Sequence, residues 1–180
     1  MQTERGKLIE LLRLAHAGER AAAFAYAGHW RSVRDPDERA AIRAIEDEEW
    51  AHRRCLAGML AGLGSRPALV REPIMATIGR LLGLGCFVSG WFLPMYGAGW
   101  IERRNVWENV TAARYAAAAG EDSLVEPLLR MAEVEWDHEQ YFRTRVRASW
   151  QVRRLRIPLW RGLPPRDELR SGFIPLKAAS

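Results

Sequence analysis

The chain has 180 residues, of which 48% are hydrophobic, so it is long enough and apolar enough to bury the core of one domain. This composition excludes an intrinsically disordered chain, and two cysteines are too few for a disulfide framework or a cysteine-based zinc site. The formal net charge of +5 is unevenly spread, because residues 143–180 carry a net charge of +8 and the rest of the chain therefore carries −3.

Helical periodicity runs through nearly the whole chain, and no run of alternating β-branched residues predicts a strand. A first helix is expected over residues 3–31. Asp35 and Pro36 predict the start of a second helix, because aspartate is a good N-cap residue and proline fits the first helical position. This second helix is expected to end near residue 62, where glycines interrupt the pattern.

An uncharged stretch follows over residues 81–101. Its length alone would allow a membrane span. Its five glycines and Pro94 argue against one uniform lipid-facing helix. The pattern therefore favours a buried or membrane-dipping hairpin, broken near Pro94, over a true span.

Two more helices are predicted beyond this hairpin. One covers about residues 98–119, and the next follows a capping-box sequence at residues 123–126 and runs to about residue 148. Residues 1–148 are therefore expected to form a helical domain, and residues 149–180 a basic tail rich in Trp, Arg and Pro. Such a tail suits an anionic partner, either a phospholipid surface or a nucleic acid.

Two Glu-x-x-His units stand out within the predicted helices. Residues three apart share one face of a helix, so each unit can aim a carboxylate and an imidazole at one point. In both halves of the chain, an earlier helix offers one further glutamate. Four carboxylates and two imidazoles from four helices are the ligand set of a carboxylate-bridged di-iron or di-manganese site. The candidate ligands are Glu19, Glu49, His52, Glu108, Glu135 and His138.

The third of these helices offers two glutamates, Glu102 and Glu108, whose six-residue spacing places them on different sides of the helix. Glu108 is preferred because it lies deeper in the helix, between two valines. Glu102 precedes two arginines and resembles a solvated charge at a helix start. Glu133 and Glu139 are assigned to a solvated acidic face.

The repeated order of these elements predicts the fold. A helix with a lone glutamate and a helix with Glu-x-x-His occur twice, and the apolar hairpin separates the two pairs. Burying four carboxylates is costly unless a cation lies among them, and iron prefers such oxygen ligands together with imidazole. We therefore expect an all-α, ferritin-like four-helix bundle with an apolar helical hairpin between the two helix pairs.

Local sequences resemble those of the demethoxyubiquinone hydroxylase family, a ferritin-like di-iron family. Residues 13–19 (RLAHAGE), followed by YAG at 26–28, resemble its opening helix. The similarity continues through EWAH at 49–52 and EWDH at 135–138, and covers roughly residues 8–148. The resemblance assigns the iron ligands to the six residues above. It also makes Tyr115, seven residues after Glu108, a candidate catalytic residue beside the metals.

The resemblance implies O2-dependent hydroxylation of the ring of a prenylated quinol of the demethoxyubiquinol type, in ubiquinone biosynthesis. The expected cofactors are two iron ions, with manganese as the alternative, and NADH or another reductant as the electron source. The expected location is the cytoplasmic side of the bacterial inner membrane, with peripheral attachment through the hairpin and the basic tail. The expected partners are the lipid substrate, O2, the membrane surface, and a second copy of the chain or a biosynthetic complex.

Several positions depart from the usual pattern of that family. It has acidic or histidine residues where this chain has Ala15, Asn109, Ala113 and Arg114. Such groups orient ligands and tune a metal, so substrate or reduction can differ. Two alternatives stay open: a tRNA-modifying di-iron hydroxylase and a non-catalytic lipid- or quinone-binding protein. The basic tail favours RNA, but the uncharged hairpin disfavours it, so a nucleic acid is not the expected partner.

Overall fold

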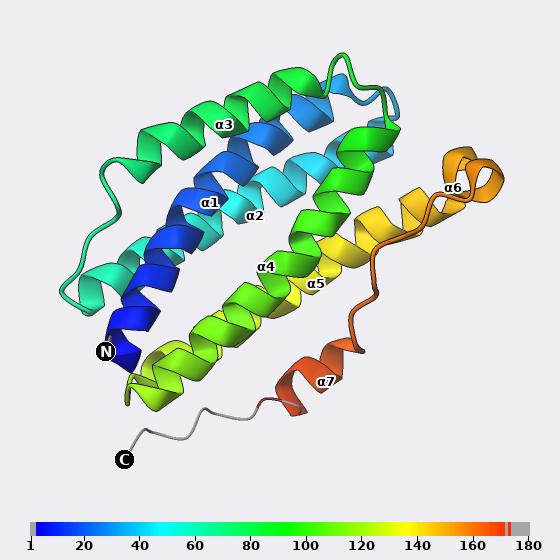
Figure 1. Ribbon diagram of the computed structural model, residues 1–180. Helices are drawn as coiled ribbons and strands as arrows, with labels where there is room; N and C mark the ends of the chain where they lie inside the picture. Colours follow the sequence, from blue (N-terminus) through cyan, green and yellow to red (C-terminus); the bar gives the residue numbers. More distant parts are fainter. Residues whose placement is uncertain (1–2, 172, 174–180) are drawn as a thin grey trace. The chain divides into compact units, whose positions relative to one another are not determined.

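The structure, a computed structural model, describes residues 3–171 and residue 173. No strand occurs among these residues (Figure 1), so the predicted all-α class is confirmed, with the helix order of a ferritin-like fold. Residues 172 and 174–180, at the end of the predicted basic tail, lie outside the described residues. The helices are α1 (Glu4–Ser32), α2 (Pro36–Gly62), α3 (Arg71–Gly85), α4 (Phe92–Ala118), α5 (Val125–Ala148), α6 (Trp150–Leu155) and α7 (Arg166–Ser171), with a 3-10 turn, η1 (Asp122–Leu124), before α5.

The chain divides into two compact units. Residues 9–94 form the first, here called the α1–α3 unit because it holds those three helices, apart from the first turn of α1. The residues from Met95 onward form the second, together with the first turn of α1, and it is here called the α4–α7 unit.

Helix α2 shows how the sequence builds the first unit. Asp35 caps its N-terminus, as predicted, because its carboxylate accepts hydrogen bonds from the backbone N–H groups of Asp37 and Glu38. At the C-terminal end of the helix, Gly64 adopts a φ of +67°, the left-handed conformation that commonly terminates helices. Between these ends, buried residues alternate at spacings of three and four, which is the period of one continuous helix face. These residues are Ile42, Ile45, Glu49, His52, Leu56 and Met59.

Helix α3 packs against α1 through small side chains. A Cβ added at Gly79 would lie under 3.0 Å from the backbone of Ala21, and one added at Gly28 would lie under 3.0 Å from Gly83. Only glycine therefore permits this helix separation. The buried seam of α3 consists of Glu72, Ala76, Gly79 and Gly83.

The opposite side of α3 is exposed and apolar. Its large side chains are between 40% and 65% exposed. In the connection that follows, Phe87 lies in the same range and Val88 is more exposed. Within the described part of the chain, no helix combines the length and the apolarity that crossing a membrane requires. The exposed side chains of α3 are Ile74, Ile78, Leu81, Leu82 and Leu84.

The predicted hairpin is present, but its turn comes before Pro94. The chain turns at residues 86–91, and α4 begins at Phe92, six residues before the predicted start. Pro94 lies in the first turn of α4, where its missing N–H has no intrahelical partner to lose. The predicted capping box at residues 123–126 is wrong, because η1 covers residues 122–124 and the N-cap of α5, Leu124, makes no side-chain cap.

In the α4–α7 unit, the basic tail packs on the helices that precede it. Trp160 is 7% exposed, and its ring forms an edge-on contact with Tyr96 of α4. Arg170 of α7 forms ion pairs with Glu126 and Glu133 of α5. The tail arginines are therefore not all available to an anionic partner. The apolar core of this unit comprises Leu8, Met95, Val106, Val110, Leu128, Met131, Phe142 and Val146.

Candidate metal centre

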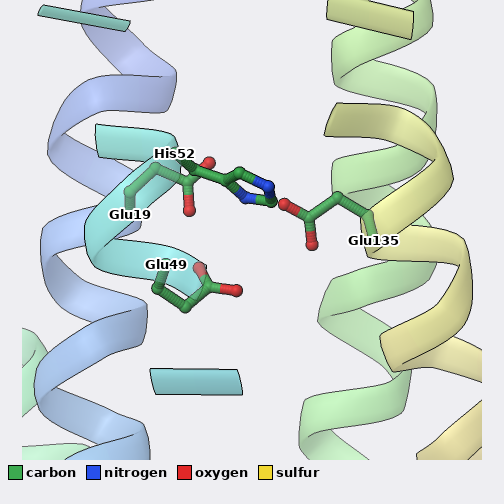
Figure 2. Close-up of side chains that lie close together, drawn as sticks. All are labelled: Glu19, Glu49, His52 and Glu135. Atoms are coloured by element: carbon green, nitrogen blue, oxygen red, sulfur yellow. The ribbon is translucent and has the colours of Figure 1, made fainter. Parts of the chain in front are cut away.

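The α1–α3 unit brings together three of the predicted ligands. One oxygen each of Glu19 and Glu49 and one ring nitrogen of His52 lie within 4.8 Å of one another. All three side chains are buried, and Glu49 is 0% exposed. Figure 2 shows them converging from α1 and α2, and also draws Glu135. We call Glu19, Glu49 and His52 the first triad.

The α4–α7 unit holds a second triad of the same composition. It consists of Glu102, Glu135 and His138, whose ligand atoms also lie within 4.8 Å of one another. Glu102 and Glu135 are 0% exposed and His138 is 4% exposed. His138 Nδ1 lies 3.6 Å from Glu135 Oε2, the pairing expected for residues three apart on a helix. Asn105 Nδ2 donates a 3.0 Å hydrogen bond to Glu102 Oε2 and orients that carboxylate.

Glu102 replaces Glu108, so the sequence-based choice between them is wrong. Glu108 is only partly buried and its carboxylate accepts a 2.6 Å hydrogen bond from Arg104 Nε. Val106 is fully buried, and a residue two positions further on is rotated by about 200° around the helix axis. Glu108 is two residues from each of the buried valines, Val106 and Val110, and therefore lies on the opposite side of the helix from both.

The sequence did contain the signal that identifies Glu102. The buried positions of α4 recur at alternating spacings of four and three, and Glu102 lies in that series whereas Glu108 does not. The same series on α2 and α5 includes their ligand pairs. On α4 it is Met95, Gly99, Glu102, Val106, Asn109, Ala113 and Ala116.

Tyr115 does not lie beside Glu102, the triad residue of α4. It follows Glu102 by thirteen residues, which is about 20 Å along a helix axis. Its ring lies under the ammonium group of Lys7, 5.6 Å from Nζ to the ring centroid. The prediction of a catalytic Tyr115 is therefore wrong, because it depended on proximity to the metal ligands.

A buried polar network borders the first triad. His16, one turn before Glu19 on α1, contacts Glu72 of α3, with 2.6 Å between Nδ1 and Oε1. Arg53 Nη2, beside His52 on α2, lies 2.7 Å from Glu72 Oε2. The network therefore joins the three helices next to the ligands.

Burial and charge set the protonation states in this network. Burial, the largest effect, raises the pKa of Glu72, but hydrogen bonds from Arg53 and His16 outweigh it, and the net pKa is below the ordinary value. Burial also lowers the pKa of His16, despite its hydrogen bond to Glu72. Glu72 is thus ionised and His16 neutral at pH 7, so His16 donates from Nδ1.

Glu139 and Glu133 do not form a solvated face, so that prediction is wrong. Glu139 is 0% exposed, and its Oε1 accepts a 2.6 Å hydrogen bond from Trp160 Nε1. The Arg143 guanidinium lies 3.3 Å from the same oxygen. The Glu133 side chain is 14% exposed and pairs with Arg170. Sequence reasoning missed these contacts because they depend on where the tail folds back.

Comparison with known proteins supplies one finding. Residues 6–103, more than half of the chain, match the family model described as Ubiquinone biosynthesis protein COQ7. The matched segment includes the first triad and Glu102 but ends before Glu135 and His138. Neither a curated protein nor a solved structure gives a significant match.

Proposed function

Because this chain belongs to the family of Ubiquinone biosynthesis protein COQ7, we propose that it is a di-iron monooxygenase that hydroxylates the ring of a prenylated quinol of the demethoxyubiquinol type. The observation that carries the proposal is the pair of buried triads, each with two carboxylates and one imidazole. Family membership supports a hydroxylase of ubiquinone biosynthesis, and the triads support a metal.

The donor set fits iron. Buried carboxylates within 4.8 Å of one another repel unless positive charge lies among them. Oxygen ligands with imidazole suit iron and also manganese, whereas the absence of thiolate ligands from both triads disfavours a structural zinc. In the proposed enzyme each triad supplies two carboxylates and one imidazole to one iron ion, which gives the chain two irons.

The chain's own residues hold and shield this centre. Bound iron would supply the activation of O2, with one oxygen atom entering the ring, the other leaving as water, and two electrons coming from NADH or another reductant. Ile45 and Leu56, one turn on either side of the ligand pair of α2, keep water from it. Asn105 holds the Glu102 carboxylate.

Peripheral attachment to the membrane is part of the proposal, and the proposed substrate and the exposed surface of α3 support it. A prenylated quinol partitions into lipid, so the enzyme must reach it at the bilayer surface. The exposed apolar side chains of α3 suit insertion into the acyl boundary, and the exposed arginines of α6 suit anionic head groups. We place this attachment at the cytoplasmic face of the bacterial inner membrane.

Metal content tests the first part of the proposal. Anaerobic reconstitution of the purified chain with Fe(II) should give two irons per chain. Glu102→Gln should lose iron because it removes a triad carboxylate, whereas the matched variant Glu108→Gln, on the same helix, should keep both. Equal loss in the two variants, or none in either, would contradict the assignment of the second triad.

Complementation tests the second part. Expression in a strain lacking demethoxyubiquinone hydroxylase should restore ubiquinone and remove its precursor from lipid extracts, and Glu49→Ala should not. Precursor accumulation despite good expression and full iron loading would exclude this substrate. Salt-sensitive binding of RNA by the iron-loaded chain would then favour the tRNA-modifying alternative, and a chain that binds quinone but no iron would be the non-catalytic one.

A further inference from the structure

We infer that the tail segment 156–165, here called the strap, positions the second triad through Trp160. This inference rests on the proposed metal function. Figure 1 shows the strap, in orange, leading from α6 to α7. It belongs to the same compact unit as the second triad, and it lies beyond the segment matched by the family model.

The strap is attached to α4 and α5 at successive points. Tyr96 Oη of α4 donates a 2.8 Å hydrogen bond to the carbonyl of Pro158. From α5, Arg143 Nη1 donates a 2.9 Å bond to the carbonyl of Trp160, and Trp136 Nε1 donates a 2.8 Å bond to the carbonyl of Pro164. An extended segment held by side chains of both helices fixes their separation.

Trp160 lies at the level of the triad. Its ring rests on the backbone of α4 at Gly99, because a Cβ added there would lie under 3.0 Å from the ring. Gly99 precedes Glu102 by three residues, which is one helical turn. A larger residue at 99 would push the ring off α4, and a smaller one at 160 would leave a cavity between the helices.

Trp160 also acts on α5. Its indole N–H donates a 2.6 Å hydrogen bond to Glu139, which is 0% exposed, follows His138 directly and lies one turn after Glu135. Arg143 of α5 contacts the same oxygen, and Gln140 donates a hydrogen bond to the other oxygen of Glu139. Loss of the Trp160 bond would remove the shortest of these contacts and leave a buried carboxylate beside two metal ligands freer to compete for the cation. Trp160 therefore both spaces the helices and keeps a non-ligand carboxylate out of the triad.

The test is anaerobic titration with Co(II), followed by its visible absorption, on the full chain at a temperature where circular dichroism shows every variant folded. The wild type should bind two Co(II) ions. Trp160→Ala should weaken one site by about 10- to 100-fold, the usual range for groups that orient ligands, and leave the other unchanged. Trp150→Ala, at a tryptophan that is 61% exposed on α6, is the matched control and should bind as the wild type does.

Two further variants separate positioning from simple stabilisation. Trp160→Phe keeps most of the ring but loses the bond to Glu139, and should weaken the same site by a smaller factor. Gly99→Ala should weaken that site in the wild-type chain and have a smaller further effect in a Trp160→Ala chain, because the colliding ring is then absent and only the looser contact with Phe142 Cβ, at 3.0 Å, remains.

Each outcome decides between the two proposals. Two unaltered Co(II) sites in folded Trp160→Phe and Gly99→Ala chains, even with a lowered melting temperature, would overturn the positioning role and leave the metal function standing. A wild-type chain that binds no Co(II) would overturn both.

Discussion

Glu49 illustrates the conflict between stability and metal binding at a single residue. It is fully buried, and one of its oxygens lies within 4.8 Å of a carboxylate oxygen of Glu19. Two negative charges that close together in a dry interior destabilise the metal-free fold. A cation bound to both removes that penalty and stabilises the folded state by mass action.

Glu49→Gln should therefore have opposite effects in the two states. The metal-free variant should be more stable than metal-free wild type, by about 1–2 kcal/mol, because a repulsive charge is gone. With Fe(II) present the order should reverse. Urea unfolding with chelator and with Fe(II) measures both, and a metal-free variant that is less stable than wild type would contradict the repulsion.

His29 should make the stability of the fold depend on pH. It is 3% exposed near the end of α1, and burial lowers its pKa from 6.5 to about 4. Protonation therefore favours the unfolded chain. The stability that the neutral imidazole contributes is fully present above pH 6.5. As the pH falls from 6.5 towards 4, the free energy of unfolding decreases by about 3 kcal/mol in total.

Replacing His29 tests this directly. The free energy of unfolding of metal-free wild type should fall between pH 7 and pH 4.5 more steeply than that of His29→Leu. The difference between the two slopes isolates His29 from His16, whose lowered pKa acts in the same direction in both chains. Parallel slopes would mean that His29 titrates normally in the folded protein.

At the scale of the helix, the contact between α1 and α3 depends on the absence of side chains. Gly28→Ala would place a Cβ under 3.0 Å from Gly83, and Gly18→Ala on the same helix would place one in open space. The first change should destabilise the fold by about 1–3 kcal/mol through overpacking. The second should stabilise it by about 0.5–1 kcal/mol, because alanine is the better helix former.

Chemical denaturation of both variants measures the difference. Since both changes add the same methyl group to the same helix, their opposite signs would report the α1–α3 separation and not helix propensity. Two stabilised variants would show that α3 moves away from α1 without cost.

Helix periodicity explains what the sequence could predict at this scale. The bounds of α2 match the prediction because Asp35, Pro36 and the glycines after residue 61 each act locally. The two Glu-x-x-His pairs were found because both members lie on one element. The register of α4 was missed because its glycine- and alanine-rich face has little hydrophobic contrast, so Glu108 could not be separated from Glu102 by hydrophobic neighbours alone.

Contacts made over long sequence separations could not be predicted. Glu139 carries no local mark of burial, and only the position of Trp160, 21 residues later, shows that it is bonded. The same holds for His16 and Glu72, which are 56 residues apart. Both networks lie next to ligands, and for Glu139 the local sequence had predicted a solvated charge.

At the scale of the whole molecule, charge and apolar exposure predict how the proposed binding to lipid depends on lipid charge and on salt. Arg166 and Arg170 pair with acids of α5, but Arg153, Arg154 and Arg156 are exposed, and residues 140–166 contain no acid. Binding to vesicles should therefore require anionic lipid and weaken as salt increases, since surface charges are screened.

Vesicle flotation separates the two contributions. Replacing Arg153, Arg154 and Arg156 by serine should remove the dependence on anionic lipid. Leu81→Ser with Leu84→Ser should weaken binding to all vesicles, because it removes exposed apolar surface from α3. Binding that neither set of changes affects would exclude both surfaces as the membrane contact.

Helix α3 exposes its large apolar side chains and buries its small ones. Its inward seam holds two glycines, an alanine and a salt-bridged glutamate, and its isoleucines and leucines point outward. In an ordinary amphipathic helix the large apolar side chains face the core, so exposing the outer face of α3 to water is unfavourable. A preparation without detergent or lipid should accordingly self-associate through α3, and a mild amphiphile should return it to dispersed particles.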